Sequence, residues 1–217
     1  MMRAPERSPE RDAALDALLP LVPFEGWTMT ALRHGLRDAG LDPEDADLLF
    51  PGGTLDLIEA HSDLADRRME AVGAAPEFAA MRLPAKVRGL IAARLERSRG
   101  DRDAIRRALG ILALPRNAML AAGIVARTVD TIWHAAGDRS ADFSWYTKRA
   151  ILTGVYSSTL LFWLRDESDD HEATLAFLDR RLAGVARLGK MRRRAEERLK
   201  PRRAAGSGEQ GVAVVPG

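Results

Sequence analysis

Hydrophobic residues recur at helical spacing along almost all of the 217-residue chain. No segment alternates strictly between apolar and polar residues over six positions, so the pattern predicts no half-buried strand. Alanine, leucine, arginine and glutamate, which all favour helices, are abundant. Glycine and proline positions divide the pattern into about nine to ten helices. The sequence therefore predicts an all-α fold.

One predicted helix, from about Ala141 to Leu164, is apolar on two sides. With about 100° of rotation per residue, its first apolar face comprises Trp145, Leu152, Tyr156 and Trp163. The opposite face comprises Phe143, Ala150, Gly154 and Leu161. Such a helix lies within a core or keeps one face for a ligand, a membrane or a partner. We therefore predict that Leu152, Tyr156 and Trp163 line the core or a lipid cavity.

The order of helices resembles that of TetR repressors, with a small helix-turn-helix-like unit over residues 8–75 and a helical ligand-binding bundle over residues 76–186. The second helix of the turn, Asp42–Leu49, carries four carboxylates and no basic residue. These charges would repel DNA phosphates, so we expect no nucleic-acid partner. The alternative interpretation is a TetR-like transcriptional regulator with a hydrophobic effector.

The composition offers little for catalysis. The chain has no cysteine, and none of its four histidines follows a carboxylate at a spacing of three, as di-iron bundles require. Phosphate-binding loops and nucleophile motifs are missing as well. We therefore predict that the protein is not an enzyme and holds no cofactor or metal.

The charge of the chain is concentrated near its C-terminus. The segment Arg187–Arg203 has nine basic and two acidic residues, a net charge of +7, whereas the whole chain has +2. Apolar residues share one helical face there, with arginines around it, which is typical of an interfacial helix. We predict a basic amphipathic helix over residues 187–200, followed by a disordered segment, 201–217; a solvated extension of the last core helix is the alternative. The predicted contacts with an anionic membrane are Leu188, Met191, Arg193, Arg194, Arg198 and Leu199.

Three runs of residues resemble the COQ9 family of ubiquinone-biosynthesis proteins. They are ALPRN at 113–117, WHAAGDRS at 133–140 and DFSWYTKR at 142–149, in this order. The resemblance extends over about residues 12–188, and it implies a TetR-like fold that is not used for DNA. It also implies a homodimer.

The same resemblance implies a non-enzymatic lipid-binding protein. Family members hold polyprenylated aromatic intermediates, that is polyprenyl-phenol or quinone lipids, and present them to the demethoxyubiquinone hydroxylase. Their apolar docking patch corresponds here to Ile132, Trp145, Tyr146 and Arg149. Because adjacent helical residues point about 100° apart, Trp145 and Tyr146 are both covered only if two neighbours pack on them.

The N-terminus is too charged for a secretory signal and too acidic for a mitochondrial presequence, and arginine greatly outnumbers lysine. We therefore expect a bacterial, alphaproteobacterial family member. Its expected place is cytoplasmic and peripheral, at the inner face of the cytoplasmic membrane.

Overall fold

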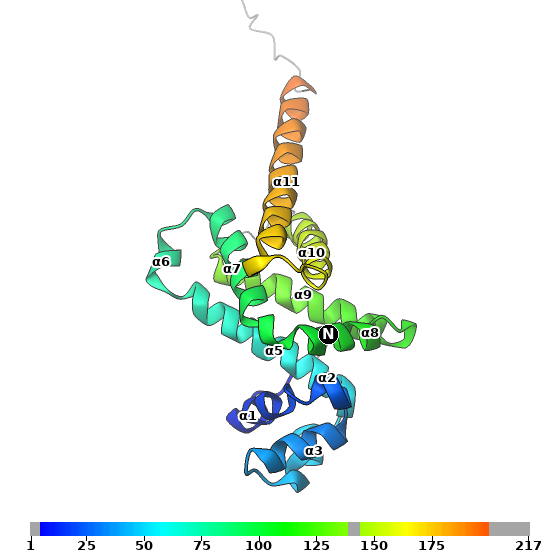
Figure 1. Cartoon of the computed structure of the whole chain (residues 1–217). Helices are drawn as coiled ribbons and strands as arrows, with labels where there is room; N and C mark the ends of the chain where they lie inside the picture. The colour runs from blue at the N-terminus through cyan, green and yellow to red at the C-terminus, as the bar shows by residue number, and fades with distance from the viewer. Residues whose placement is uncertain (1–4, 139–143, 200–217) are drawn as a thin grey trace, which may run out of the picture. The chain divides into compact units, whose positions relative to one another are not determined.

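The computed structural model describes residues 5–138 and 144–199, and these residues form helices joined by turns, with no strand (Figure 1). The predicted all-α fold is confirmed. The α-helices are α1 (Pro9–Leu18), α2 (Val22–Glu25), α3 (Met29–Asp38), α4 (Ala46–Leu49), α5 (Gly53–Gly73), α6 (Pro76–Ala79), α7 (Leu83–Arg97), α8 (Arg102–Leu112), α9 (Ala118–Ala135), α10 (Ser144–Trp163) and α11 (Glu172–Leu199). The short 3-10 helices are η1 (Pro43–Asp45), η2 (Arg99–Asp101), η3 (Pro115–Asn117) and η4 (Asp169–His171).

The chain divides into one compact unit that ends at Leu182 and a second that begins at Ala183. All packing described below belongs to the first unit. Within it, α5 packs against α1, α7 and α9, so this helix contacts elements on both sides of the predicted boundary at residue 75. The four predicted domains stay predictions.

The N-terminal helices share a core of large side chains between α1, α3 and α5, which includes Leu18, Leu32 and Leu57. Helices α1 and α3 approach each other closely at Gly35, where an added Cβ would lie 2.6 Å from the carbonyl oxygen of Ala17. Glycine at this position therefore permits the close contact between the two helices.

The helix-turn-helix-like unit exposes its acidic residues. The second helix of the turn consists of η1 followed by α4, and the four carboxylates of this segment are exposed to solvent. One of them, Asp47, accepts a hydrogen bond from Arg33 of α3 at 2.6 Å. The face that a DNA-binding protein turns to phosphates is thus acidic in this protein.

A buried ion pair joins four helices in the centre of the first unit. Arg94 of α7 donates from Nε to Asp66 of α5 at 2.7 Å, and Thr128 of α9 donates to the other carboxylate oxygen at 2.8 Å. The Arg94 guanidinium lies 5.5 Å from the centre of the Tyr156 ring of α10. Burial raises the pKa of Asp66, whereas the charge and hydrogen bond of Arg94 lower it. These contacts set the positions of α7, α9 and α10 relative to α5.

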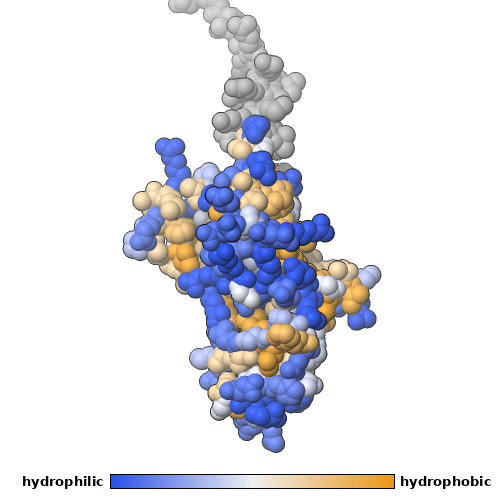
Figure 2. All heavy atoms as spheres, in the orientation of Figure 1, coloured by the Kyte–Doolittle hydropathy of each residue, from blue (hydrophilic) through white to orange (hydrophobic). Residues whose placement is uncertain are grey.

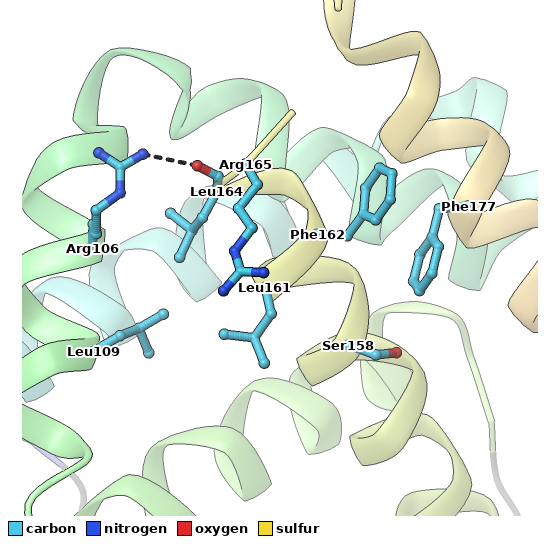
Figure 3. A pocket seen from close by; sticks show the side chains of 8 residues that line it. All are labelled: Arg106, Leu109, Ser158, Leu161, Phe162, Leu164, Arg165 and Phe177. Atoms are coloured by element: carbon cyan, nitrogen blue, oxygen red, sulfur yellow. Dashed lines mark hydrogen bonds between the residues drawn. The ribbon is translucent and has the colours of Figure 1, made fainter. Parts of the chain in front are cut away.

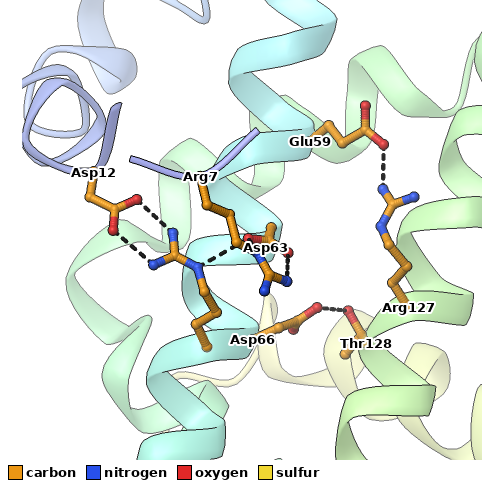
Figure 4. A network of polar contacts seen from close by, with 8 residues as sticks. Arg7, Asp12, Glu59, Asp63, Asp66, Arg127 and Thr128 are labelled. Atoms are coloured by element: carbon orange, nitrogen blue, oxygen red, sulfur yellow. Dashed lines mark hydrogen bonds and ion pairs between the residues drawn. The ribbon is translucent and has the colours of Figure 1, made fainter. Parts of the chain in front are cut away.

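A second set of ion pairs ties the start of the chain to α5 (Figure 4). Asp63 accepts hydrogen bonds from Arg7 at 2.7 and 2.9 Å and from Arg67 at 3.1 Å. Arg67 also binds both carboxylate oxygens of Asp12 in α1. Because Asp63 is buried and two arginines share it, this set is more than an isolated surface pair.

We predict that Asp66→Ala lowers the free energy of unfolding by about 3–5 kcal/mol, because it leaves the buried Arg94 without its counter-ion. Asp179→Ala is the matched control, since Asp179 pairs with Arg88 at 2.7 Å on the surface. Its removal should cost below about 1 kcal/mol. Urea denaturation followed by circular dichroism measures both values; equal losses would show that the buried pair has no special role.

Candidate functional site

Helix α10 confirms the predicted aromatic helix over its described residues, and its first apolar face is directed inward. Leu152, Tyr156 and Trp163 are all buried. Tyr156 packs beside Arg94. Burial raises the pKa of the Tyr156 hydroxyl to about 12. Trp163 lies under the guanidinium of Arg102 at 4.9 Å. These three side chains pack in the core, and their contact with a lipid stays a prediction.

The beginning of α10 carries a compact group of aromatic and basic side chains. The guanidinium carbon of Arg149 lies 3.6 Å from the centre of the Trp145 ring, within the distance of about 6 Å at which cation–π attraction acts. The Tyr146 ring meets the Trp145 ring edge-on, with 4.7 Å between their centres. Trp145 is half-buried, and Tyr146 is 70% exposed. We call Trp145, Tyr146 and Arg149 the aromatic–arginine group.

This group is anchored to α9. Arg149 donates a hydrogen bond from Nε to Asp130 of α9. Close by in sequence, Lys148 donates to Asp138, just past the end of α9, at 3.0 Å. Two of the sequence runs that carry the family resemblance therefore contact each other through charged side chains.

The prediction that Ile132 belongs to the docking patch is wrong, because its side chain is 0% exposed. In α9, Ile124, Thr128 and Ile132 are buried at a spacing of four residues, so they share one helical face. Thr128 binds Asp66 of α5, and this places the shared face toward the interior. Ile132 therefore stabilises the core and has no surface to offer a partner.

An open pocket lies beside the second apolar face of α10, between α8, α10 and the first turns of α11 (Figure 3). Its volume is about 660 Å³, which is within the usual range of small-molecule sites. Leu161, at the centre of the second face, is 59% exposed. The lining residues are Arg106, Leu109, Ser158, Leu161, Phe162, Leu164, Arg165 and Phe177.

The pocket walls are mainly apolar. Phe162 of α10 and Phe177 of α11 stack face to face, with 4.6 Å between their ring centres and 10° between their planes. None of the residues predicted to bind lipid, Leu152, Tyr156 and Trp163, lines this pocket, because they lie on the other side of α10. Of the residues that line the pocket, only Leu161 belongs to the second apolar face that the sequence predicts for this helix. Leu109 and Phe177 belong to other helices, so the pattern within α10 could not indicate them.

The surface around these features is mixed. Figure 2 shows a largely hydrophilic face with hydrophobic residues gathered in separate small patches. Phe24, Leu48 and Met119 are other strongly exposed apolar side chains. In the described ranges, no group of three or more histidine, aspartate and glutamate side chains is placed to hold a metal ion.

The predicted membrane contacts lie in the last part of α11, which is helical through Leu199. The side chains of Leu188, Met191, Arg193, Arg194, Arg198 and Leu199 are outside the described part of the structure. The segment 201–217, predicted to be disordered, is outside it too. Among the helices that the structure describes, no single one has the length and hydropathy of a membrane span; only Arg99–Leu112 and Pro115–Ala135 together do, across a bend of 98°.

Comparison with known proteins gives the following similarities. A COQ9 family model matches residues 118–189, which include α9, α10 and the first part of α11. The chain is 33% identical to the mitochondrial ubiquinone biosynthesis protein COQ9 of Xenopus tropicalis, over 81% of this chain and 57% of that protein. It is 30% identical to the human mitochondrial COQ9, again over 81% of this chain and 57% of that protein. The chain thus spans a little over half the length of these relatives.

A solved structure has a similar fold. The TetR transcriptional regulator from Nitrosomonas europaea ATCC 19718 superposes with a TM-score of 0.68. The two sequences are 26% identical, and the match covers 82% of this chain and 99% of that one. The predicted TetR-like fold is therefore confirmed.

Proposed function

The chain belongs to the COQ9 family, and from this premise we propose that it acts in ubiquinone biosynthesis as a non-enzymatic lipid-binding protein. Its ligand would be a polyprenylated phenol or quinone, which it presents to the demethoxyubiquinone hydroxylase. The observation that carries the proposal is the position of the family match. Residues 118–189 include α10, which holds the aromatic–arginine group and contributes to the pocket.

We assign the first contact with the lipid to the pocket beside the second face of α10. Its walls of leucine and phenylalanine suit an apolar chain or an aromatic ring, and the pocket is already open. Leu152, Tyr156 and Trp163 lie behind this face in the core. Their proposed contact with lipid requires a movement that makes these packed side chains accessible.

We assign the docking of the hydroxylase to the aromatic–arginine group. Tryptophan, tyrosine and arginine are the residues that most often dominate the binding energy of protein interfaces. The stacking of Arg149 on Trp145 and its bond to Asp130 restrict these side chains before binding, which lowers the entropy lost in a complex. Buried Ile132 has no part in this surface.

We predict that Trp145→Lys weakens the binding of the demethoxyubiquinone hydroxylase by about tenfold or more. The fold should persist because Trp145 is only half-buried, which circular dichroism checks. Phe24→Lys is the matched control: Phe24 is an aromatic residue of α2 that is 83% exposed, and its variant should bind normally. The measurement is co-purification of the two proteins, and unchanged co-purification of the Trp145 variant would refute the docking assignment.

We further propose that residues 187–200 contact the anionic inner face of a bacterial cytoplasmic membrane. The net charge of +7 over Arg187–Arg203 supports this, since each basic residue near such a surface contributes about 1 kcal/mol. A protein held there would meet quinone lipids where they reside.

Deletion of the residues after Arg187 is expected to abolish binding to liposomes that contain anionic lipid, because most of the local positive charge is lost. Binding of the full chain should fall as salt is raised, and neutral liposomes serve as the control. Flotation in a density gradient measures the bound fraction. Equal flotation of the truncated and full chains would contradict the proposal.

We also propose a homodimer, for which the part of the second face of α10 away from the pocket, at Ala150 and Gly154, offers an exposed surface of small residues. A second candidate function is a TetR-like regulator with a hydrophobic effector, which the similarity to a TetR transcriptional regulator favours. The exposed acidic residues of η1 and α4 weigh against it, because they would face DNA phosphates with like charge.

A further inference from the structure

Two arginines are the only charged residues that line the pocket, and they differ in their contacts. Arg106 of α8 donates to the carbonyl oxygen of Leu164 at 2.8 Å and forms an ion pair with Asp103. Its charge is therefore already compensated. Its bond to Leu164 also fixes the backbone just before Arg165, where α10 has ended.

Arg165 has no such partner. Among the side chains that the structure describes, in residues 5–138 and 145–187, none forms a hydrogen bond or ion pair with its guanidinium group. Figure 3 shows the guanidinium group directed into the pocket, between Leu109 and Leu161. No carboxylate lines the pocket either. Arg165 is exposed to solvent, so its positive charge lies at the open side of the pocket, next to apolar walls.

Ser158, the other polar residue that lines the pocket, is not a partner for Arg165. Ser158 already donates its hydroxyl proton to backbone oxygens of its own helix, at 2.7 Å to Gly154 and 3.1 Å to Val155. Guanidinium binds carboxylate and phosphate oxygens with two parallel hydrogen bonds, and it is less strongly hydrated than an ammonium group. A bound oxyanion would therefore provide the hydrogen-bond acceptors for the guanidinium group of Arg165.

We infer that the pocket binds an amphiphile with an oxyanion head group, a carboxylate or a phosphate, which Arg165 holds. The apolar part of the molecule lies against Leu109, Leu161 and the stacked pair Phe162 and Phe177. This inference rests on the proposed lipid-binding function and narrows its ligand class: among polyprenylated phenols, one that also bears a carboxylate or phosphate group is preferred over one without a negative charge.

The test uses three ligands with the same chain: dodecanoate, dodecyl phosphate and dodecanol, each below its micelle concentration. Isothermal titration of the full-length protein should show that both anions bind about tenfold or more tightly than the alcohol. Arg165→Gln should remove this preference and leave the binding of dodecanol unchanged. Arg37→Gln is the matched control, because Arg37 is an exposed arginine of α3 and the variant keeps the basic C-terminal segment.

Two results would overturn the inference without touching lipid binding itself. One is equal affinity of the wild-type protein for dodecanoate and dodecanol, and the other is an anion preference that survives in the Arg165 variant. Inorganic phosphate that displaces dodecyl phosphate at equal concentration would show a site for free anions instead of an amphiphile.

Failure of the proposed lipid site has a different signature. Leu161→Glu introduces a charge into the apolar wall at an exposed position, so the fold should persist. If this variant binds all three ligands as the wild type does, the pocket is not the lipid site. In that case the head-group inference fails with it.

Discussion

The buried ion pair between Asp66 and Arg94 is the contact on which the arrangement of the first unit depends. Its two charges are removed from water, so each needs the other and the hydrogen bond of Thr128. Because these residues come from α5, α7 and α9, and Tyr156 adds α10, one polar cluster sets the relative positions of four helices. A purely apolar core would allow these helices to slide more easily.

The proposed function gives α10 several roles, and the fixed position of this helix explains how they are combined. Tyr156 holds its inner face against the central ion pair, so Leu161 on the opposite face remains outside. The beginning of the helix exposes Tyr146, and its end contributes Phe162 to the pocket. In the proposed function, ligand and partner therefore meet the same rigid element at different places, and lipid release can be coupled to docking.

The sequence predicted the helices and the inward face of α10 because both follow from periodicity within one segment. It misplaced Ile132, since the direction of that side chain depends on which side of α9 is covered by α5. It also missed the pocket: Leu109 and Phe177 are far apart in the sequence, and nothing in the local pattern tells that their helices lie beside α10. That no described side chain pairs with Arg165 follows only from the three-dimensional arrangement of the helices.

The proposed function places a prenylated lipid in the pocket beside α10. Mass spectrometry of lipid extracted from the protein, purified from a host that makes ubiquinone, tests it most directly. The wild-type protein should contain a prenylated phenol or quinone, and the Leu161→Glu variant should contain far less of it. Absence of prenylated lipid from the wild type, or equal amounts in both proteins, would contradict the account.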